Sequence, residues 1–196
     1  MPAVITPLFG RWIAPAGALL AATTLLLAAP ATNAMAQDQC PGAAIAPSAQ
    51  TLRQAASAVV CLVNVERARN GLLLLLDDRQ LAQAAARHSR DMVEHAFFSH
   101  VTPSGGILSD RLRRSRYIRP NTAWDVGEAL GWGSGASATP SAIVVAWIAS
   151  PPHERILLGA DFRQVGVGIA AGSPEPGAPG ITGASYTLDA GVIRDG

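Results

Sequence analysis

The order of two hydrophobic patterns along the chain most constrains its fold. From Leu52 to Val63 the apolar residues recur at helical spacing. Near the C-terminus, VGVGIAAG and ITGASYTLDAGVIR are typical of strands and are separated by the turn-forming segment SPEPGAPG. Helices that come first and strands that come mostly late, with no regular alternation, favour an α+β layered domain over a doubly wound sheet. The 196 residues, nearly half of them apolar, are enough for one domain.

Spacing and capping signals predict five elements before the two C-terminal strands. They are a helix from Leu52 that ends at Asn70-Gly71, a helix from the capping box Asp77/Gln80 to about His95, a short helix in 109–117, a strand at 124–133, and a helix capped by Thr139 and ended by Ser150-Pro151-Pro152. The glycines Gly166 and Gly168 lie in a predicted strand, where we expect close packing against a helix rather than a dinucleotide fingerprint.

The first 36 residues have the pattern of an export signal. A long apolar run follows Arg11, and the small residues Ala34–Ala36 surround a cleavage site of the small-x-small type. We therefore predict a signal peptide at 1–36, a linker at 37–50 and a secreted mature chain. A transmembrane anchor is the alternative, although Pro15 and Pro30 interrupt the run.

Two cysteines, Cys40 and Cys61, are the only ones in the chain. In an oxidising exported location two cysteines usually pair, so we predict a disulfide between the mature N-terminus and the first helix. Two unpaired buried thiols are the alternative.

The charge balance gives no sign of nucleic-acid binding. The formal net charge is +1, and every basic residue other than histidine is an arginine. Five arginines between Arg111 and Arg119 form the densest basic segment. They could bind anionic lipid or a cell-wall polymer, or they could form an ordinary exposed helix face.

The four histidines fall into two pairs. His88 and His95 are seven residues apart, about two turns of a helix, so they cannot easily share one ion. With Asp91 and Glu94 they have the pattern of a solvated helix face. His100 and His153 instead follow breaks in regular structure, where sites often lie.

Glu128 is a carboxylate inside a predicted strand, where burying a neutral residue costs less. Two imidazoles, from His100 and His153, together with this carboxylate would be the ligand set of an open zinc site. From spacing alone, separate hydrogen-bonded or exposed residues are the alternative.

Six segments resemble, in order and spacing, the bacterial branch of the CAP superfamily of cysteine-rich secretory proteins, antigen 5 and pathogenesis-related proteins, also called SCP domains. The segments are LVNVERARNGL, LAQAAARHSRDM, FFSHVTPSGG, VGEALGW, AWIASPPHERIL and FRQVGVGIA, within about 51–191. The resemblance implies a domain at 51–196 with a three-layer α-β-α sandwich. It also implies a secreted protein with a histidine and glutamate cleft that in some members binds a divalent metal such as zinc.

Carried over by motif, His100 matches the histidine of the family's FSH segment, Glu128 the glutamate of its GEN segment, and His153 the histidine after its Ser-Pro-Gly. Ala129 and Pro152 depart from those motifs, which changes the rim of the cleft. No match exists for a second family glutamate on the later helix. Glu154 is the possible accessory residue in its place.

Three functions remain open on this basis. The first is a secreted, non-catalytic domain whose cleft binds a divalent metal or a small extracellular ligand. The second is a metal-dependent extracellular hydrolase that acts on peptide or cell-wall bonds, for which Glu154 is the only nearby candidate base by sequence. The third is a structural or adhesive envelope protein.

Overall fold

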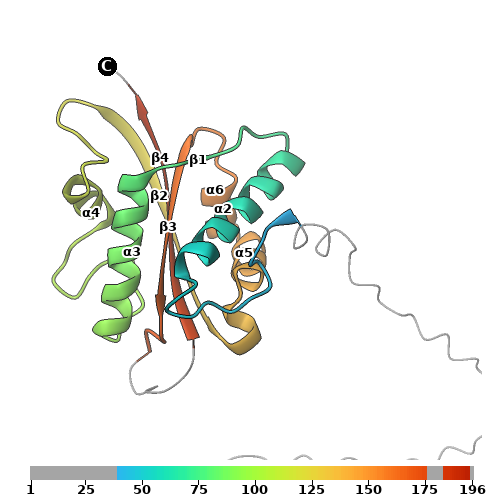
Figure 1. The fold of residues 1–196 in the computed structure, drawn as a ribbon. Helices are drawn as coiled ribbons and strands as arrows, with labels where there is room; N and C mark the ends of the chain where they lie inside the picture. Colours follow the sequence, from blue (N-terminus) through green and yellow to red (C-terminus); the bar gives the residue numbers. More distant parts are fainter. Residues whose placement is uncertain (1–38, 176–182, 195–196) are drawn as a thin grey trace, which may run out of the picture.

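A four-stranded sheet with strand order β1-β3-β4-β2 forms the middle of the domain (Figure 1). The computed structural model describes residues 39–175 and 183–194. The strands are β1 (Leu76–Asp77), β2 (Ala123–Ser134), β3 (Gln164–Ala171) and β4 (Gly183–Arg194). β1 pairs in parallel with β3, and the other two pairings are antiparallel. The long strand β2 is therefore an edge strand.

Helices cover both faces of this sheet. On one side lie α3 (Arg79–Glu94) and α4 (Leu108–Arg114), and on the other lie α2 (Leu52–Arg69), α5 (Pro140–Ile148) and α6 (Pro151–Leu157) (Figure 1). A short 3-10 helix, η1 (Gly135–Ala138), connects β2 to α5. The predicted α+β class and the three-layer α-β-α arrangement are confirmed.

Alternation along β3 shows why the two faces differ. Val165, Val167 and Ile169 lie in the main hydrophobic core together with residues of α2 and α5. Gly166 and Gly168 point to the opposite face, where a Cβ atom would overlap the backbone of α3. Because successive residues of a strand face opposite sides, one strand supplies both an apolar face and a close-contact face. The expectation for these glycines is confirmed.

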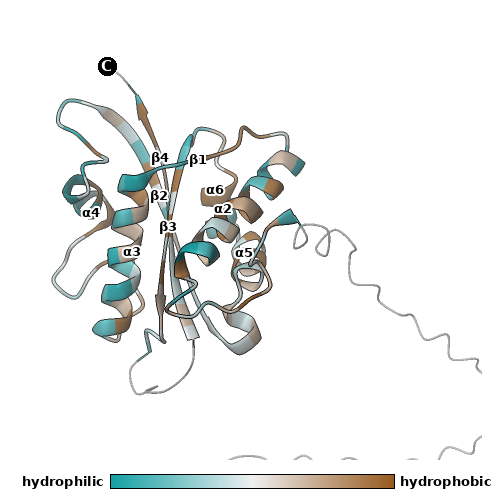
Figure 2. Ribbon diagram, viewed as in Figure 1, coloured by the Kyte–Doolittle hydropathy of each residue, from teal (hydrophilic) through white to brown (hydrophobic). Residues whose placement is uncertain are grey.

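The two helical layers also differ in polarity. Figure 2 shows α5 in largely hydrophobic colour, whereas α3 carries more hydrophilic residues. Trp147 of α5 is buried, and its indole N–H donates to the Leu130 carbonyl at 2.8 Å. The smaller core on the α3 side consists of Leu81, Ala84, Leu112, Tyr117 and Ile118. Polar groups at the sheet therefore concentrate on the α3 and α4 side.

Most predicted boundaries are confirmed, with two corrections. Gly71, with φ +68°, follows the end of α2 as expected. The N-cap of α3 is Asp78, not Asp77, because Asp78 accepts a hydrogen bond from the Leu81 amide at 2.9 Å. Asp77 instead pairs with Val165 in β1. The segment expected only to end α5 also starts α6, with proline in the first turn.

The predicted disulfide is confirmed: Cys40 and Cys61 are bonded across a sequence separation of 21. It joins the segment before α2 to the middle of that helix. The signal peptide expected at 1–36 lies outside the described residues, and the linker at 37–50 is described only from residue 39. Within the described ranges, no helix has the length and apolarity needed to cross a membrane.

Candidate functional site

Two of the three predicted site residues are in direct contact. The Nδ1 atom of His100 lies 2.7 Å from Oε1 of Glu128. His100 lies in the loop between α3 and α4, whereas Glu128 lies in the middle of β2. The side chain of His100 is 57% exposed and that of Glu128 only 3%. A buried carboxylate therefore holds one edge of an exposed imidazole.

The alternation of β2 explains the direction of Glu128. A Cβ atom on the preceding Gly127 would meet Ile156 of α6 and Phe162. Glu128 therefore points to the other face, towards α3 and α4. Because β2 is an edge strand, the His100 loop from one helical layer and α6 from the other can both reach this edge.

Arg111 of α4 completes the contacts of Glu128. Its Nη2 donates to Oε2 of Glu128 at 2.5 Å, and its Nη1 donates to the His100 carbonyl at 3.0 Å. The Arg111 side chain is 6% exposed. One interpretation of the five arginines was an exposed basic helix face. The burial of Arg111 excludes this residue from such a face. Arg111 fixes both the carboxylate and the backbone of the histidine loop.

His88 was wrongly placed by the sequence analysis on a solvated face. It is 1% exposed, and its Nε2 lies 3.0 Å from the Ser99 carbonyl and 4.0 Å from Oε2 of Glu128. Since a carbonyl only accepts, Nε2 carries the proton and donates. Burial, more than any other influence, lowers the pKa of His88. A neutral His88 thus anchors the loop next to His100.

The sequence contained a signal for His88. Leu81, Ala85, His88 and Met92 are all buried on α3. They follow the helical spacing of one face, so His88 lies on the apolar stripe and not opposite it. His95, seven residues on, is exposed and pairs with Asp91 at 2.9 Å, as a solvated face requires.

A second buried carboxyl group lies next to Glu128, on the paired strand β4. Asp189 is directly opposite Glu128 in the β2–β4 register and is fully buried. Its hydrogen-bond contact is with the Glu128 carboxylate, to which a protonated Asp189 can donate. Burial, then the negative charge of Glu128, hold the pKa of Asp189 well above its usual range. Asp189 is accordingly a neutral acid, and sequence reasoning did not identify it.

The charge state of Glu128 is the opposite. Burial raises its pKa, but the hydrogen bond from His100 and the positive charge of Arg111 together outweigh that effect. The pKa of Glu128 is therefore below its ordinary value. The carboxylate is ionised, so His100 donates from Nδ1 and its Nε2 bears the lone pair.

His153, the third predicted residue, lies in the first turn of α6 and not in a loop. Its Nδ1 is 3.0 Å from the Ser150 hydroxyl oxygen. Burial lowers the pKa of His153, and a positive charge on His100 would lower it further. The two imidazoles are thus close enough to affect each other electrostatically.

Glu154 lies in the first turn of α6 beside His153. Among the described residues, no hydrogen bond or ion pair joins Glu154 to His100, Glu128 or His153. Within 39–175 and 183–194, no group of three or more His, Cys, Asp or Glu side chains is arranged to hold a metal ion. Of the predicted set, the structure brings His100 and Glu128 into direct contact, and His153 lies near enough to His100 for an electrostatic effect.

An apolar pocket adjoins His153. It has a volume of about 250 Å³, and Phe98, Trp132 and Trp147 contribute its aromatic walls. Trp132 and Trp147 therefore form part of the pocket wall. Trp124 does not: it is 36% exposed and lies under the guanidinium of Arg113, 5.8 Å from the ring centroid.

Comparisons with known proteins agree with this architecture. The profile of the cysteine-rich secretory protein family, CAP, matches residues 60–177. The solved structure of an extracellular protein containing a SCP domain from Bacillus anthracis str. Ames has a TM-score of 0.59 and 27% sequence identity. That match covers 76% of this chain and 44% of the other chain.

Two curated proteins of Bacillus subtilis (strain 168) are also similar. The uncharacterized membrane protein YlbC is 33% identical over 111 residues, which is 57% of this chain and 30% of that protein. The uncharacterized protein YkwD is 35% identical over 116 residues, 59% of this chain and 42% of that protein. The chain spans less than half the length of these curated relatives.

Proposed function

Since the chain belongs to the CAP family of cysteine-rich secretory proteins, as its six sequence motifs indicated, we propose that the domain is an extracellular, non-catalytic binding module. In this proposal, His100 and His153 together bind a divalent metal ion, and the adjoining apolar pocket accepts part of a small ligand. The predicted signal peptide, the disulfide and the likeness to an extracellular SCP-domain protein support the extracellular location.

The observation that carries the proposal is the 2.7 Å contact between His100 Nδ1 and Glu128. A metal-binding histidine commonly donates its second ring N–H to a carboxylate, which fixes the tautomer and the orientation of the ring. Here the same contact leaves the Nε2 lone pair of an exposed ring free for a ligand. His153 has its Nδ1 fixed by Ser150 in a comparable way.

Glu128 acts in this arrangement as the residue that orients His100, and not as the third ligand. Both of its oxygens already have strong partners, His100 and Arg111. Two imidazoles leave the remaining positions of a zinc ion to water or to an external ligand. A bound ion would supply a Lewis acid that holds an oxygen or nitrogen of that ligand.

The hydrolase alternative has less support. Hydrolysis of a peptide or wall bond requires a general base within hydrogen-bond reach. Glu128 is held by Arg111, and Glu154 has no contact with the histidines among the described residues. We therefore expect no turnover of peptides or peptidoglycan by the purified domain, with or without a chelator.

Isothermal titration of Zn²⁺ into the mature domain tests the proposal. We expect saturable binding by the wild type and none by the His100→Ala/His153→Ala variant. His95→Ala is the matched control, because it removes an exposed histidine outside the cluster. Equal heats from the wild type and the double variant would exclude the histidine pair as the metal site.

A further inference from the structure

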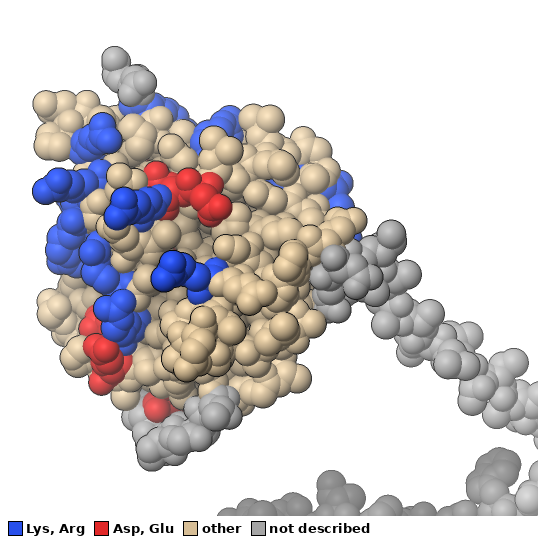
Figure 3. All heavy atoms as spheres, in the orientation of Figure 1, with Lys and Arg blue, Asp and Glu red and all other residues tan. Residues whose placement is uncertain are grey.

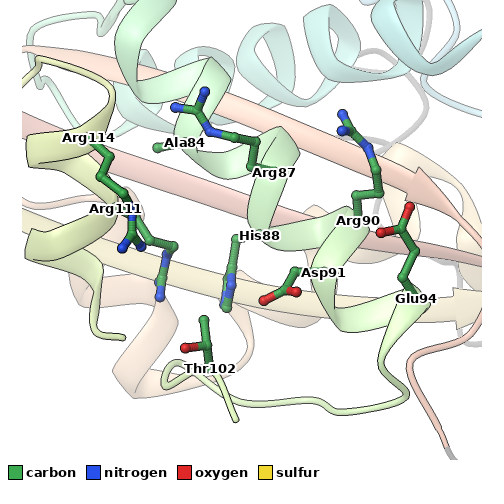
Figure 4. A pocket seen from close by; sticks show the side chains of 9 residues that line it. All are labelled: Ala84, Arg87, His88, Arg90, Asp91, Glu94, Thr102, Arg111 and Arg114. Carbon is green, nitrogen blue, oxygen red and sulfur yellow. The ribbon is translucent and has the colours of Figure 1, made fainter. Parts of the chain in front are cut away.

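A second pocket lies between α3, α4 and the loop that carries His100. Its volume is about 220 Å³. The residues that matter for its chemistry are Ala84, Arg87 and His88 from α3, Thr102 from the loop, and Arg111 and Arg114 from α4 (Figure 4). The α3 residues are three and four positions apart, so they share one face of that helix. Arg111 and Arg114 are likewise one turn apart on α4.

Two of these arginines have no internal partner. Within 39–175 and 183–194, neither Arg87 nor Arg114 forms an ion pair or a side-chain hydrogen bond. Figure 3 shows that basic side chains gather on the side of the molecule formed by α3 and α4, whereas the α2 side is mostly uncharged. Because Arg111 is neutralised by Glu128, the remaining basic groups of the pocket are Arg87, Arg90 and Arg114, and of these Arg114 lies beside the loop.

The loop leaves room for the guanidinium of Arg114. Its Nη2 lies 3.7 Å from the position that a Cβ atom on Gly106 would take. Gly106 also donates its amide to the Thr102 hydroxyl oxygen at 2.9 Å. The Thr102 hydroxyl therefore lies at the same rim as Arg114, as a second type of polar group for a ligand.

Acidic residues occupy the other end of the pocket. Figure 4 shows Asp91 and Glu94 on the side of Arg90, away from Arg111 and Arg114. Asp91 is 2.9 Å from His95, which lies outside the pocket. Asp91 is one helical turn from Arg87 and reduces the charge there, whereas Arg114 and Thr102 lie at the end of the pocket away from both acids.

A buried nitrogen of a residue that lines this pocket lacks a partner. In the part of the chain that the structure describes, the Arg111 Nε–H has no hydrogen-bond acceptor. A buried N–H donor without an acceptor is costly, and such a group in a native protein calls for an explanation. An oxyanion in the pocket would supply an acceptor beside Arg111.

We propose that this pocket binds a phosphate group, held by the guanidinium groups of Arg87 and Arg114. Planar guanidinium groups match the oxygens of phosphate in pairs, and charge-assisted hydrogen bonds of this kind are the strong ones. The volume is below the range of about 300–1,000 Å³ typical of drug-sized ligands, as expected for a compact anion or headgroup. Binding here is separate from the histidine pair, although Arg111 contacts both sites.

Titration of inorganic phosphate into the mature domain, followed by amide chemical shifts at constant ionic strength, tests the proposal. We expect saturable shifts that centre on α3, α4 and the loop at 102–106. The variant Arg87→Gln/Arg114→Gln should bind at least about tenfold more weakly. Arg53→Gln/Arg119→Gln removes the same charge from exposed positions that do not line the pocket, and should bind as the wild type does.

The source of the phosphate is distinguished with vesicles of phosphatidylglycerol and of phosphatidylcholine. Phosphate binding together with phosphatidylglycerol binding, both lost in Arg87→Gln/Arg114→Gln, would assign the pocket to a lipid headgroup. Phosphate binding without vesicle binding would assign it to a soluble phosphate. Equal phosphate affinity in all three proteins, or no saturable binding of either probe, would overturn the proposal, provided that thermal unfolding shows each variant to be folded.

Discussion

Glu128 determines the electrostatics of the site at the scale of single residues. One carboxylate orients His100, pairs with the buried Arg111 and, together with the larger effect of burial, keeps Asp189 on the neighbouring strand neutral. Two ionised carboxylates so close in a buried site would repel each other, so one proton remains on the pair. The exposed imidazole of His100 is therefore bonded to a buried network in which Glu128 is ionised, Arg111 is its ion-pair partner and Asp189 is neutral.

Replacing Glu128 with Gln should destabilise the domain by about 3 kcal/mol, because it leaves the buried charge of Arg111 uncompensated. Chemical denaturation measures this free energy. His100→Ala, which removes the exposed partner of the same carboxylate, should cost less than about 1 kcal/mol. A similar loss for the two variants would contradict the role given to the Arg111 pair.

His88 should make stability dependent on pH. Its pKa in the folded protein is lowered, so the unfolded chain binds a proton first as the pH falls below the ordinary value of 6.5. Stability is therefore fully present above that value and is lost as the pH falls towards the lower folded pKa. Between pH 7 and pH 5, His88→Gln should lose less stability than the wild type, by up to about 1.4 kcal/mol per pH unit.

His95→Gln is the matched control for this experiment, because His95 is exposed on the same helix. Its free energy of unfolding should follow the wild-type dependence on pH. Identical slopes for the wild type and His88→Gln would show that His88 does not carry the effect.

The sequence predicted His100 because it follows a break in regular structure and Glu128 because a carboxylate is costly inside a strand, and both match segments of the CAP family. It did not predict Arg111, since five arginines within nine residues look alike until the helix is placed on the sheet. Asp189 was missed for a similar reason: its neighbour Glu128 is sixty-one positions away and becomes one only through strand pairing. Long-range pairing of this kind is not encoded in local spacing.

At the scale of elements, the close contact between β3 and α3 positions the site. α3 carries His88. The distance between α3 and the sheet is short because the facing glycines of β3 have no Cβ atom to hold the helix away. The sequence predicted this contact, because glycines inside a strand often mark a close backbone approach. The start of α6 was not predicted. The prolines of Ser150-Pro151-Pro152 follow the end of α5 and also form the first turn of α6, and the sequence analysis considered only the first role.

Gly168→Ala should destabilise the domain by about 2 kcal/mol or more, since the added methyl group would overlap the backbone at Ala85 and Ala86 of α3. Thermal or urea unfolding measures the change. Ala171→Ser, at the exposed end of the same strand, is the control and should be nearly neutral. An unchanged stability for Gly168→Ala would mean that α3 does not pack as closely as the structure has it.

At the scale of the whole molecule, the three layers place polar groups at one edge of the sheet and the main apolar core on the other side. The disulfide joins the segment before α2 to that helix, on the side of the main core. It lies in a different helical layer from the His88 and Arg111 network, although α6 with His153 belongs to the disulfide's own layer. Loss of the disulfide should therefore leave the network that holds His100 unchanged.

The variant Cys40→Ala/Cys61→Ala should lose about 3 kcal/mol of stability, because the bond closes a loop across a sequence separation of 21. Thermal unfolding with and without a reductant measures the loss, and the reductant should affect only the wild type. We expect Zn²⁺ binding at a temperature where both proteins are folded to be unchanged. Loss of Zn²⁺ binding in the folded variant would contradict this expectation and show that the site depends on the disulfide-linked layer, which includes His153.

A crystal structure of the mature domain soaked in Zn²⁺, with data at the zinc absorption edge, tests the central claim most directly. We expect one ion bound to Nε2 of both His100 and His153 at about 2.1 Å, with Glu128 still accepting from His100 Nδ1. An ion bound directly by Glu128, or an ion located away from the two histidines, would contradict the account.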